Sequence, residues 1–172
     1  MRRFIAAMSG LACSVLFNPA MGSESCVSRS DAMALKTAAV QQQLMVAAFM
    51  CHDANAYNHF VRTYQADLQE SDASLKSYFV HRLGRRGEAA YDTYKTKVAN
   101  LSALSQAKDD RAFCGKAARL FADARESRVS LSSFVEDAPS PPGFRNVCVN
   151  VPTEVRSRMR LHIAQARSSG SR

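Results

Sequence analysis

Apolar residues recur every three or four positions along most of this chain, which is the spacing of one face of an α-helix. The first such stretch is rich in Ala, Met, Leu and Gln, with no Gly or Pro. Its apolar face would carry Leu35, Ala39, Gln42, Val46 and Phe49. Because Ser30 or Asp31 could serve as N-cap, the pattern predicts a helix over residues 31–50.

The same spacing predicts further helices downstream. A stripe from Tyr57 to Leu68 indicates a second helix capped by Asp53. A turn at residues 71–72 would start a short third helix, and Gly84 and Gly87 mark the turn that follows it. Residues 88–107 and 109–124 form the fourth and fifth patterns, each opening on acids. The period-2 alternation typical of strands does not occur, so we expect an all-α fold.

Composition changes after Arg128. Residues 129–150 contain most of the prolines and read as a rigid connector. Beyond it, Val151, Val155, Met159 and Ile163 repeat every four residues among arginines, which predicts a short basic amphipathic helix and a frayed end over residues 151–172. We therefore expect one helical bundle domain of four to six helices over residues 23–128, followed by this connector and tail.

The first 22 residues have the three parts of a secretory signal peptide. Arg2 and Arg3 precede an apolar run from Phe4 to Phe17, and Ala20-Met21-Gly22 offers a small-x-small cleavage site. The run is short for a membrane span, which disfavours an uncleaved anchor. Cleavage would leave 150 residues, enough for one domain. We expect a protein that works in the bacterial periplasm or outside the cell.

The charge of the chain is unevenly distributed. It has 23 basic and 15 acidic residues, and two of the basic ones lie in the leader, so the mature chain would carry +6. Residues 145–172 hold six arginines and one acid, whereas the rest of the mature chain is nearly neutral. Such a tail could contact an acidic partner, an anionic polysaccharide or a membrane surface. The alternative is a solvated, solubilising terminus.

Four cysteines remain once Cys13 leaves with the leader. An even number in an exported chain indicates two disulfides, and four cysteines allow three connectivities that the sequence cannot decide between. Among them we favour Cys51–Cys114 together with Cys26–Cys148. No Cys-x-x-Cys pair occurs, which disfavours both a metal cluster and thiol redox catalysis.

Several short patterns could carry chemistry but lack the context it needs. His52 and His59 could bind a metal, yet their spacing of seven is not that of a helical ligand pair, and we expect no metal or other cofactor. Ser105 and Lys108 match Ser-x-x-Lys without its accompanying motifs. The Gly84–Gly87 pattern reads as a turn between helices, and we expect no nucleic-acid binding. A small cell-wall or polysaccharide hydrolase would need paired carboxylates, and no spacing pairs Glu70, Asp72 or Glu88.

The tyrosines gather in the middle of the chain. Aromatic side chains at helical spacing usually fill the core, and a chain without Trp needs them there. They can instead line an interface or ligand groove. The candidate partner contacts are Tyr57, Tyr64 and Tyr91, with Arg156, Arg158 and Arg160 of the tail.

Several segments between Ala38 and Cys114 together resemble a group of small exported bacterial proteins. They include AYNHFVRTYQADLQ, AYDTYKTKVAN and the surroundings of Cys51 and Cys114. That group is helical, has paired cysteines and has no known function. The resemblance implies an all-helical domain and favours pairing Cys51 with Cys114. It brings no activity, substrate or site residue with it.

Together these features predict a non-enzymatic interaction protein of the bacterial envelope, binding a protein or an anionic surface. A small-molecule or metal carrier, with its site inside the bundle near His52, His59 and Cys51, is the alternative. The hydrolase ranks third. The sequence does not identify the partner or the oligomeric state.

Overall fold

The computed structural model describes residues 26–126, 129–144 and 147–150. The predicted leader and the predicted basic helix with its arginines lie outside these residues. The described part is all-α, as expected. Its helices are α1 (Arg29–Met50), α2 (Ala54–Thr63), α3 (Gln65–Leu83), α4 (Gly87–Lys108), α5 (Asp110–Glu126) and α6 (Leu131–Asp137), with a 3-10 turn at Gly84–Arg86. None of these helices is long and apolar enough to span a bilayer.

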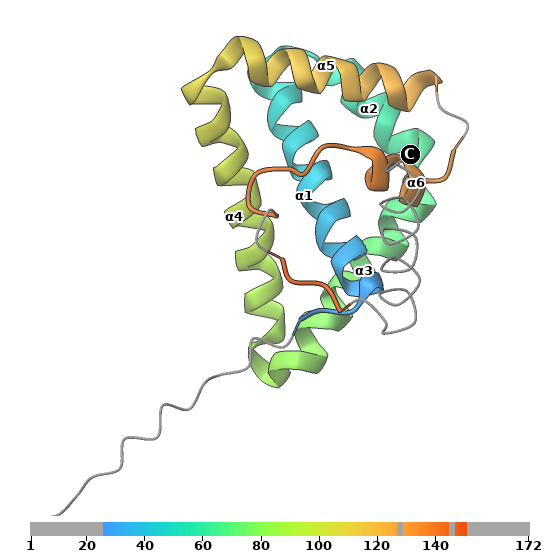
Figure 1. Cartoon of the computed structure of the whole chain (residues 1–172), viewed down its shortest axis with the longest axis vertical. Coiled ribbons are helices and arrows are strands. Elements are labelled where there is room, and N and C mark those ends of the chain that lie inside the picture. Colours follow the sequence, from blue (N-terminus) through green and yellow to red (C-terminus); the bar gives the residue numbers. More distant parts are fainter. Residues whose placement is uncertain (1–25, 127–128, 145–146, 151–172) are drawn as a thin grey trace, which may run out of the picture.

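Helix α1 is the central element, and every other α-helix contacts it. Figure 1 shows α1 between α3 and α4, with α5 crossing the ends of α1 and α4. Many of the α1 residues that face its neighbours are alanines, so the surrounding helices approach its backbone closely. Ala39, Leu44 and Ala47 are fully buried. Because α1 is surrounded, its burial is set by neighbours on several sides rather than by one apolar stripe.

The core has two parts along α1. Around its second half, Phe60, Phe121 and Phe134 from α2, α5 and α6 form one cluster. Around its first half, Leu35 and Leu75 pack with half-buried aromatic residues of α3, α4 and the connector. The other helices therefore pack around α1 along both of its halves.

Capping residues explain where several helices begin. The Ser28 side chain accepts a hydrogen bond from Asp31 N, so α1 starts earlier than its expected cap at Ser30 or Asp31. Asp53 caps α2, as predicted, and Asp109 Oδ1 accepts from Ala112 N at the start of α5. Ser130 caps α6 within the segment that composition had indicated to be an irregular connector.

Two predicted boundaries are wrong. The turn expected at residues 71–72 lies inside α3, where Asp72 is held by side chains of α4 instead of capping a helix. The stripe from Tyr57 to Leu68 belongs to two helices that meet at Tyr64, whose φ of −112° and ψ of 23° bend the chain.

Both disulfides have the favoured connectivity. Cys51–Cys114 joins the end of α1 to α5, and Cys26–Cys148 joins the segment before α1 to the segment after the prolines. Beside the second bridge, Val27 N donates to Cys148 O at 2.9 Å and Asn150 N donates to Val27 O at 2.8 Å. The connector is therefore fixed at its far end. Figure 1 shows it running from α6 below α5 and across α1 to α4.

Candidate functional site

The three candidate tyrosines do not form one surface. Tyr64 is 4% exposed and stacks on Phe134, at 5.8 Å between ring centroids, so it belongs to the core rather than to a contact surface. Its hydroxyl is buried without a hydrogen-bond partner among the described residues. Tyr57 and Tyr91 are half-buried. Burial raises the pKa of Tyr57, although a hydrogen bond with Gln41 opposes this effect.

Tyr91 takes part in a polar network between α3 and α4. Its hydroxyl donates to the Asp72 carboxylate at 2.7–2.8 Å, and Lys95 Nζ lies 2.8 Å from Asp72 Oδ1 and 2.9 Å from the Tyr91 hydroxyl. Partial burial tends to raise the pKa of Asp72, but the hydrogen bonds from Lys95 and Tyr91 prevail and lower it. The three side chains form hydrogen bonds with one another, so the network holds α3 against α4.

The other acids weighed for hydrolysis do not make a catalytic pair with Asp72. Glu88 forms an ion pair with Lys76 at 2.7 Å, between exposed side chains of α4 and α3. The side chain of Glu70 lines a different, open hollow beside α1. Asp72 and Glu88 each form an ion pair with a lysine, and both pairs join α3 to α4.

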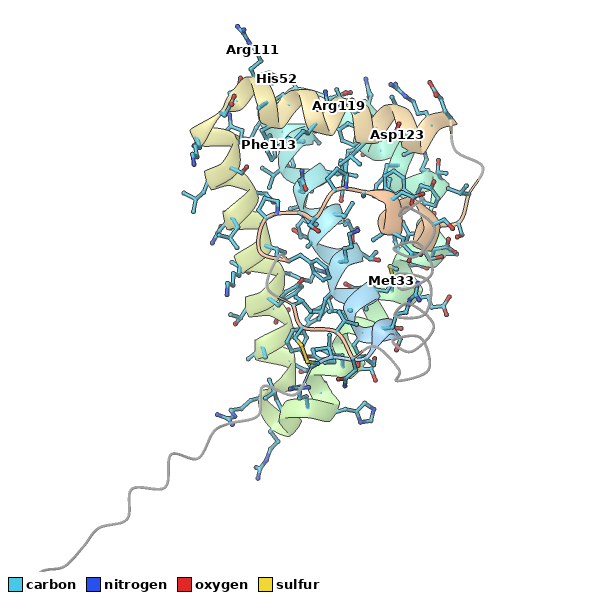
Figure 2. The ribbon with its side chains drawn as sticks, viewed as in Figure 1. Met33, His52, Arg111, Phe113, Arg119 and Asp123 are labelled. Atoms are coloured by element: carbon cyan, nitrogen blue, oxygen red, sulfur yellow. A yellow bond between two sulfur atoms is a disulfide. The ribbon has the colours of Figure 1, made fainter. Side chains whose placement is uncertain are left out.

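The two histidines weighed as metal ligands are both exposed. His59 Nδ1 shares a long hydrogen bond of 3.4 Å with Thr63 Oγ1 on the same helix. His52 lies in the turn after α1, and Figure 2 shows it near the end of the molecule where α5 crosses. Within the described ranges, no group of three or more His, Cys, Asp or Glu side chains is placed to hold a metal ion.

The structure does contain a cavity with converging polar groups, at a different place. It has a volume of about 530 Å³ and lies between the end of α4, α5, the middle of α1 and the proline-rich connector. Apolar groups that line it include Phe113, Leu120, Pro139 and Pro142. Phe113 and Leu120 are 4% and 6% exposed, so this wall is continuous with the core. The volume is in the range of known small-ligand sites.

Gln43 brings a polar group from α1 to this cavity. The residue is 7% exposed, and no hydrogen bond joins its side chain to another described residue. Among the described residues, Tyr64 Oη is the side-chain polar atom that is both fully buried and without a partner. The Gln43 amide is therefore not fully buried. The amide must therefore be reached from outside the protein, and the opening that it lines is this cavity. A carboxamide that faces a cavity without a protein partner takes a water or a ligand as its hydrogen-bond partner.

Charged groups surround the mouth of the cavity. Lys108 comes from the end of α4, and Lys116 and Arg119 come from α5. Among the described residues, the three ion pairs all involve other side chains. The acids here are Asp109, which caps α5, and Asp123. Figure 2 shows Arg119 and Asp123 on α5, and Phe113 on the side of that helix turned toward α1 and α4.

Ser105 and Lys108 of the Ser-x-x-Lys match both line the cavity. Their spacing of three places them on one face of α4. An activated serine, however, needs a base within hydrogen-bond reach, and no such bond joins these two side chains. The pair contributes polar lining rather than a nucleophile.

A larger hollow, about 800 Å³, lies between the start of α1 and α3. Its walls are largely small or polar side chains such as Ser30, Ser74 and Ser77, and it opens widely to solvent. None of its lining residues is buried, so the cavity below α5 is the better candidate.

The sequence contained one sign of this site that we did not use. Gln41, Gln42 and Gln43 interrupt an otherwise apolar stretch, and we placed Gln42 on the buried face. The structure buries Gln43 and leaves the other two partly exposed. The connector was recognised, but its role as a cavity wall depends on its path across α1.

Comparison of the chain with protein-family models, curated proteins and solved structures finds no match in any of the three.

Proposed function

We propose that this is an exported, non-enzymatic binding protein that holds a small molecule in the cavity between α1, α4, α5 and the connector. The observation that carries the proposal is the Gln43 carboxamide, which belongs to a residue that is 7% exposed, has no hydrogen-bond partner among the described residues and lines that cavity. Its hydrogen-bonding groups need a water or a ligand inside the cavity as a partner. The walls combine apolar surface with a few polar groups, as ligand sites commonly do.

The two disulfides anchor segments that line the cavity, an arrangement that suits a carrier. Cys51–Cys114 lies next to Phe113 in sequence, and Cys26–Cys148 fixes the far end of the connector, of which Pro139, Ser140 and Pro142 form one wall. Disulfides of this kind persist in oxidising compartments, which supports periplasmic or extracellular work. The predicted signal peptide supports the same location.

The hypothesis that this protein binds another protein or an anionic surface relied on the tyrosines and on the arginine-rich tail. Burial of Tyr64 removes one of its contacts, and the hydroxyl of Tyr91 is already bound to Asp72. The tail lies outside the described residues, so contact with a partner or an anionic membrane surface through Arg156, Arg158 and Arg160 remains a proposal. For these reasons the cavity ranks first.

Native mass spectrometry of the oxidised protein, purified after export to the periplasm of a bacterial host, tests this function. We expect a non-covalent adduct of a few hundred daltons that is lost in Gln43→Leu and kept in Gln42→Leu. The second variant makes the same chemical change one residue away, outside the cavity lining. A bare protein mass for the wild type, or an adduct that Gln43→Leu retains, would contradict the proposed site.

A further inference from the structure

The charges around the cavity say which kind of molecule would fit it. We propose that the ligand is an amphipathic organic anion, with its charged group among Lys108, Lys116 and Arg119 and its apolar part against Phe113 and Leu120. This inference rests on the proposed function and adds the chemical class of the ligand.

The three cations are available to a ligand. The ion pairs of the described chain join Arg29 to Glu136, Lys76 to Glu88 and Lys95 to Asp72, and none of these residues lines the cavity. Lys108, Lys116 and Arg119 are exposed side chains on α4 and α5. A bound anion would supply the counter-charge that no described side chain supplies, and charge-assisted hydrogen bonds are the stronger ones.

The acids nearby do not cancel this preference. Asp109 Oδ1 accepts the hydrogen bond from Ala112 N at 2.9 Å, so this carboxylate is directed to the start of α5. Its charge is partly offset there by the positive end of the helix dipole. Asp123 lies one turn beyond Arg119, toward the other end of α5. The positive groups therefore outnumber the free negative one where α4 meets α5.

The remaining walls exclude other ligand classes. A sugar would leave Phe113, Leu120, Pro139 and Pro142 in contact with hydroxyl groups, which gains little from the apolar wall. An organic cation would meet three like charges. An apolar neutral molecule would make no use of the three cations and would displace water from the Gln43 amide without replacing its hydrogen bond. An anion with an apolar body uses all of these groups.

Isothermal titration calorimetry with three molecules of equal chain length tests the class directly: octanoate, 1-octanol and octylammonium. We expect octanoate to bind at least tenfold more tightly than either of the others at pH 7. The double variant Lys116→Gln/Arg119→Gln should weaken octanoate binding about tenfold. The matched control Arg111→Gln/Arg125→Gln removes the same charge from the same helix outside the cavity lining and should leave the affinity unchanged.

The outcomes separate the ligand class from the function. If octanol or octylammonium binds as tightly as octanoate, and Gln43→Leu abolishes that binding, the anion class is overturned while the cavity remains the site. Equal weakening by both double variants also overturns the class, because general charge would then explain the effect. If none of the three binds and native mass spectrometry finds no adduct, the proposed function falls as well.

Discussion

At the scale of single residues, two tyrosine hydroxyls in the core have opposite surroundings. Tyr64 Oη is buried without a partner, whereas Tyr94 Oη donates to Leu35 O at 2.8 Å. Burial raises the pKa of Tyr94, with a smaller contribution from Tyr78. The two positions therefore allow the same substitution to be compared with and without a hydrogen bond.

We expect Tyr64→Phe to leave the free energy of unfolding unchanged or to raise it by up to about 1 kcal/mol, because it removes an unsatisfied polar group. Tyr94→Phe should lower it by about 1 kcal/mol, because the hydrogen bond from Tyr94 Oη to Leu35 O is lost. Urea denaturation of the oxidised protein measures both values. A clear loss of stability in Tyr64→Phe would show that its hydroxyl has a partner and would contradict this account of the core.

The Asp72 carboxylate gives the fold a dependence on acid. Because its pKa is lowered in the folded state, its stabilisation is complete above the unfolded pKa of about 4 and is lost as the pH falls through the folded value. Asp72→Asn should cost about 1 kcal/mol at pH 7, a modest value because the side chain is 40% exposed and solvent screens the pair.

Thermal unfolding of Asp72→Asn and wild type between pH 2 and pH 8 measures this effect. The difference in melting temperature should shrink steadily below about pH 4. Asp92→Asn, at an exposed position of α4, makes the same change of charge and should have little effect at any pH. A constant difference across the whole range would mean that the carboxylate charge is not what stabilises the α3–α4 contact.

At the scale of elements, the close approach of α3 and α4 depends on a glycine. A Cβ built on Gly87 would lie 2.4 Å from Val80 Cα and 2.7 Å from Phe79 O, and backbone atoms cannot move aside easily. Gly115, inside α5, has its nearest neighbour, Arg119 Nη1, at 3.9 Å. The start of α4 has room only for glycine at position 87, whereas α5 has room for a larger residue at position 115.

Gly87→Ala should therefore destabilise the protein by about 2 kcal/mol through overpacking. Gly115→Ala should stabilise it by about 0.5–1 kcal/mol, since alanine is the better helix former and has room. Differential scanning calorimetry of the two variants checks both signs. If Gly87→Ala melts like the wild type, α3 and α4 do not meet as closely as described here.

The sequence was sufficient to predict which stretches form helices, but not which side chains of each helix are buried. The periodic pattern located the helical stretches and Asp53 as a cap, because these depend on neighbouring residues. The pattern placed Phe49 on a buried face, yet it is 72% exposed. Phe49 lies at the end of α1, where burial depends on which neighbour extends far enough to cover the side chain.

The same limit applies to the cavity. Its lining comes from four segments that are distant in sequence, so no local spacing announces it. Helix α6 was missed because Ser130 and the apolar Leu131, Phe134 and Val135 form only two turns beside a proline-rich run. The bend at Tyr64 was missed because its apolar stripe is continuous on both sides.

At the scale of the whole molecule, the two disulfides connect parts that are distant in sequence. Cys51 and Cys114 are separated by 63 residues, and Cys26 and Cys148 by 122. In the chain-entropy account, closing loops of this length stabilises the fold by about 4 to 5 kcal/mol each. This is a large share of the stability of one domain, typically about 5–15 kcal/mol.

We expect Cys51→Ala/Cys114→Ala and Cys26→Ala/Cys148→Ala each to lower the urea midpoint substantially. The oxidised wild type should lose at least as much stability when dithiothreitol reduces both bridges. Midpoints that neither variant nor reduction changes would mean that the helical core alone maintains the fold, and the disulfide frame proposed for the carrier would lose its support.

The central claim is that the cavity below α5 is where this protein binds its ligand. Amide chemical shifts of the isotopically labelled, oxidised protein, recorded while octanoate is added, test it most directly. The account predicts that the shifts that change cluster at Gln43, Ser105, Phe113, Lys116 and Ser140. Changes confined to Tyr57, Tyr91 or residues 151–172 would contradict it and would return the binding function to the tyrosines and the basic tail.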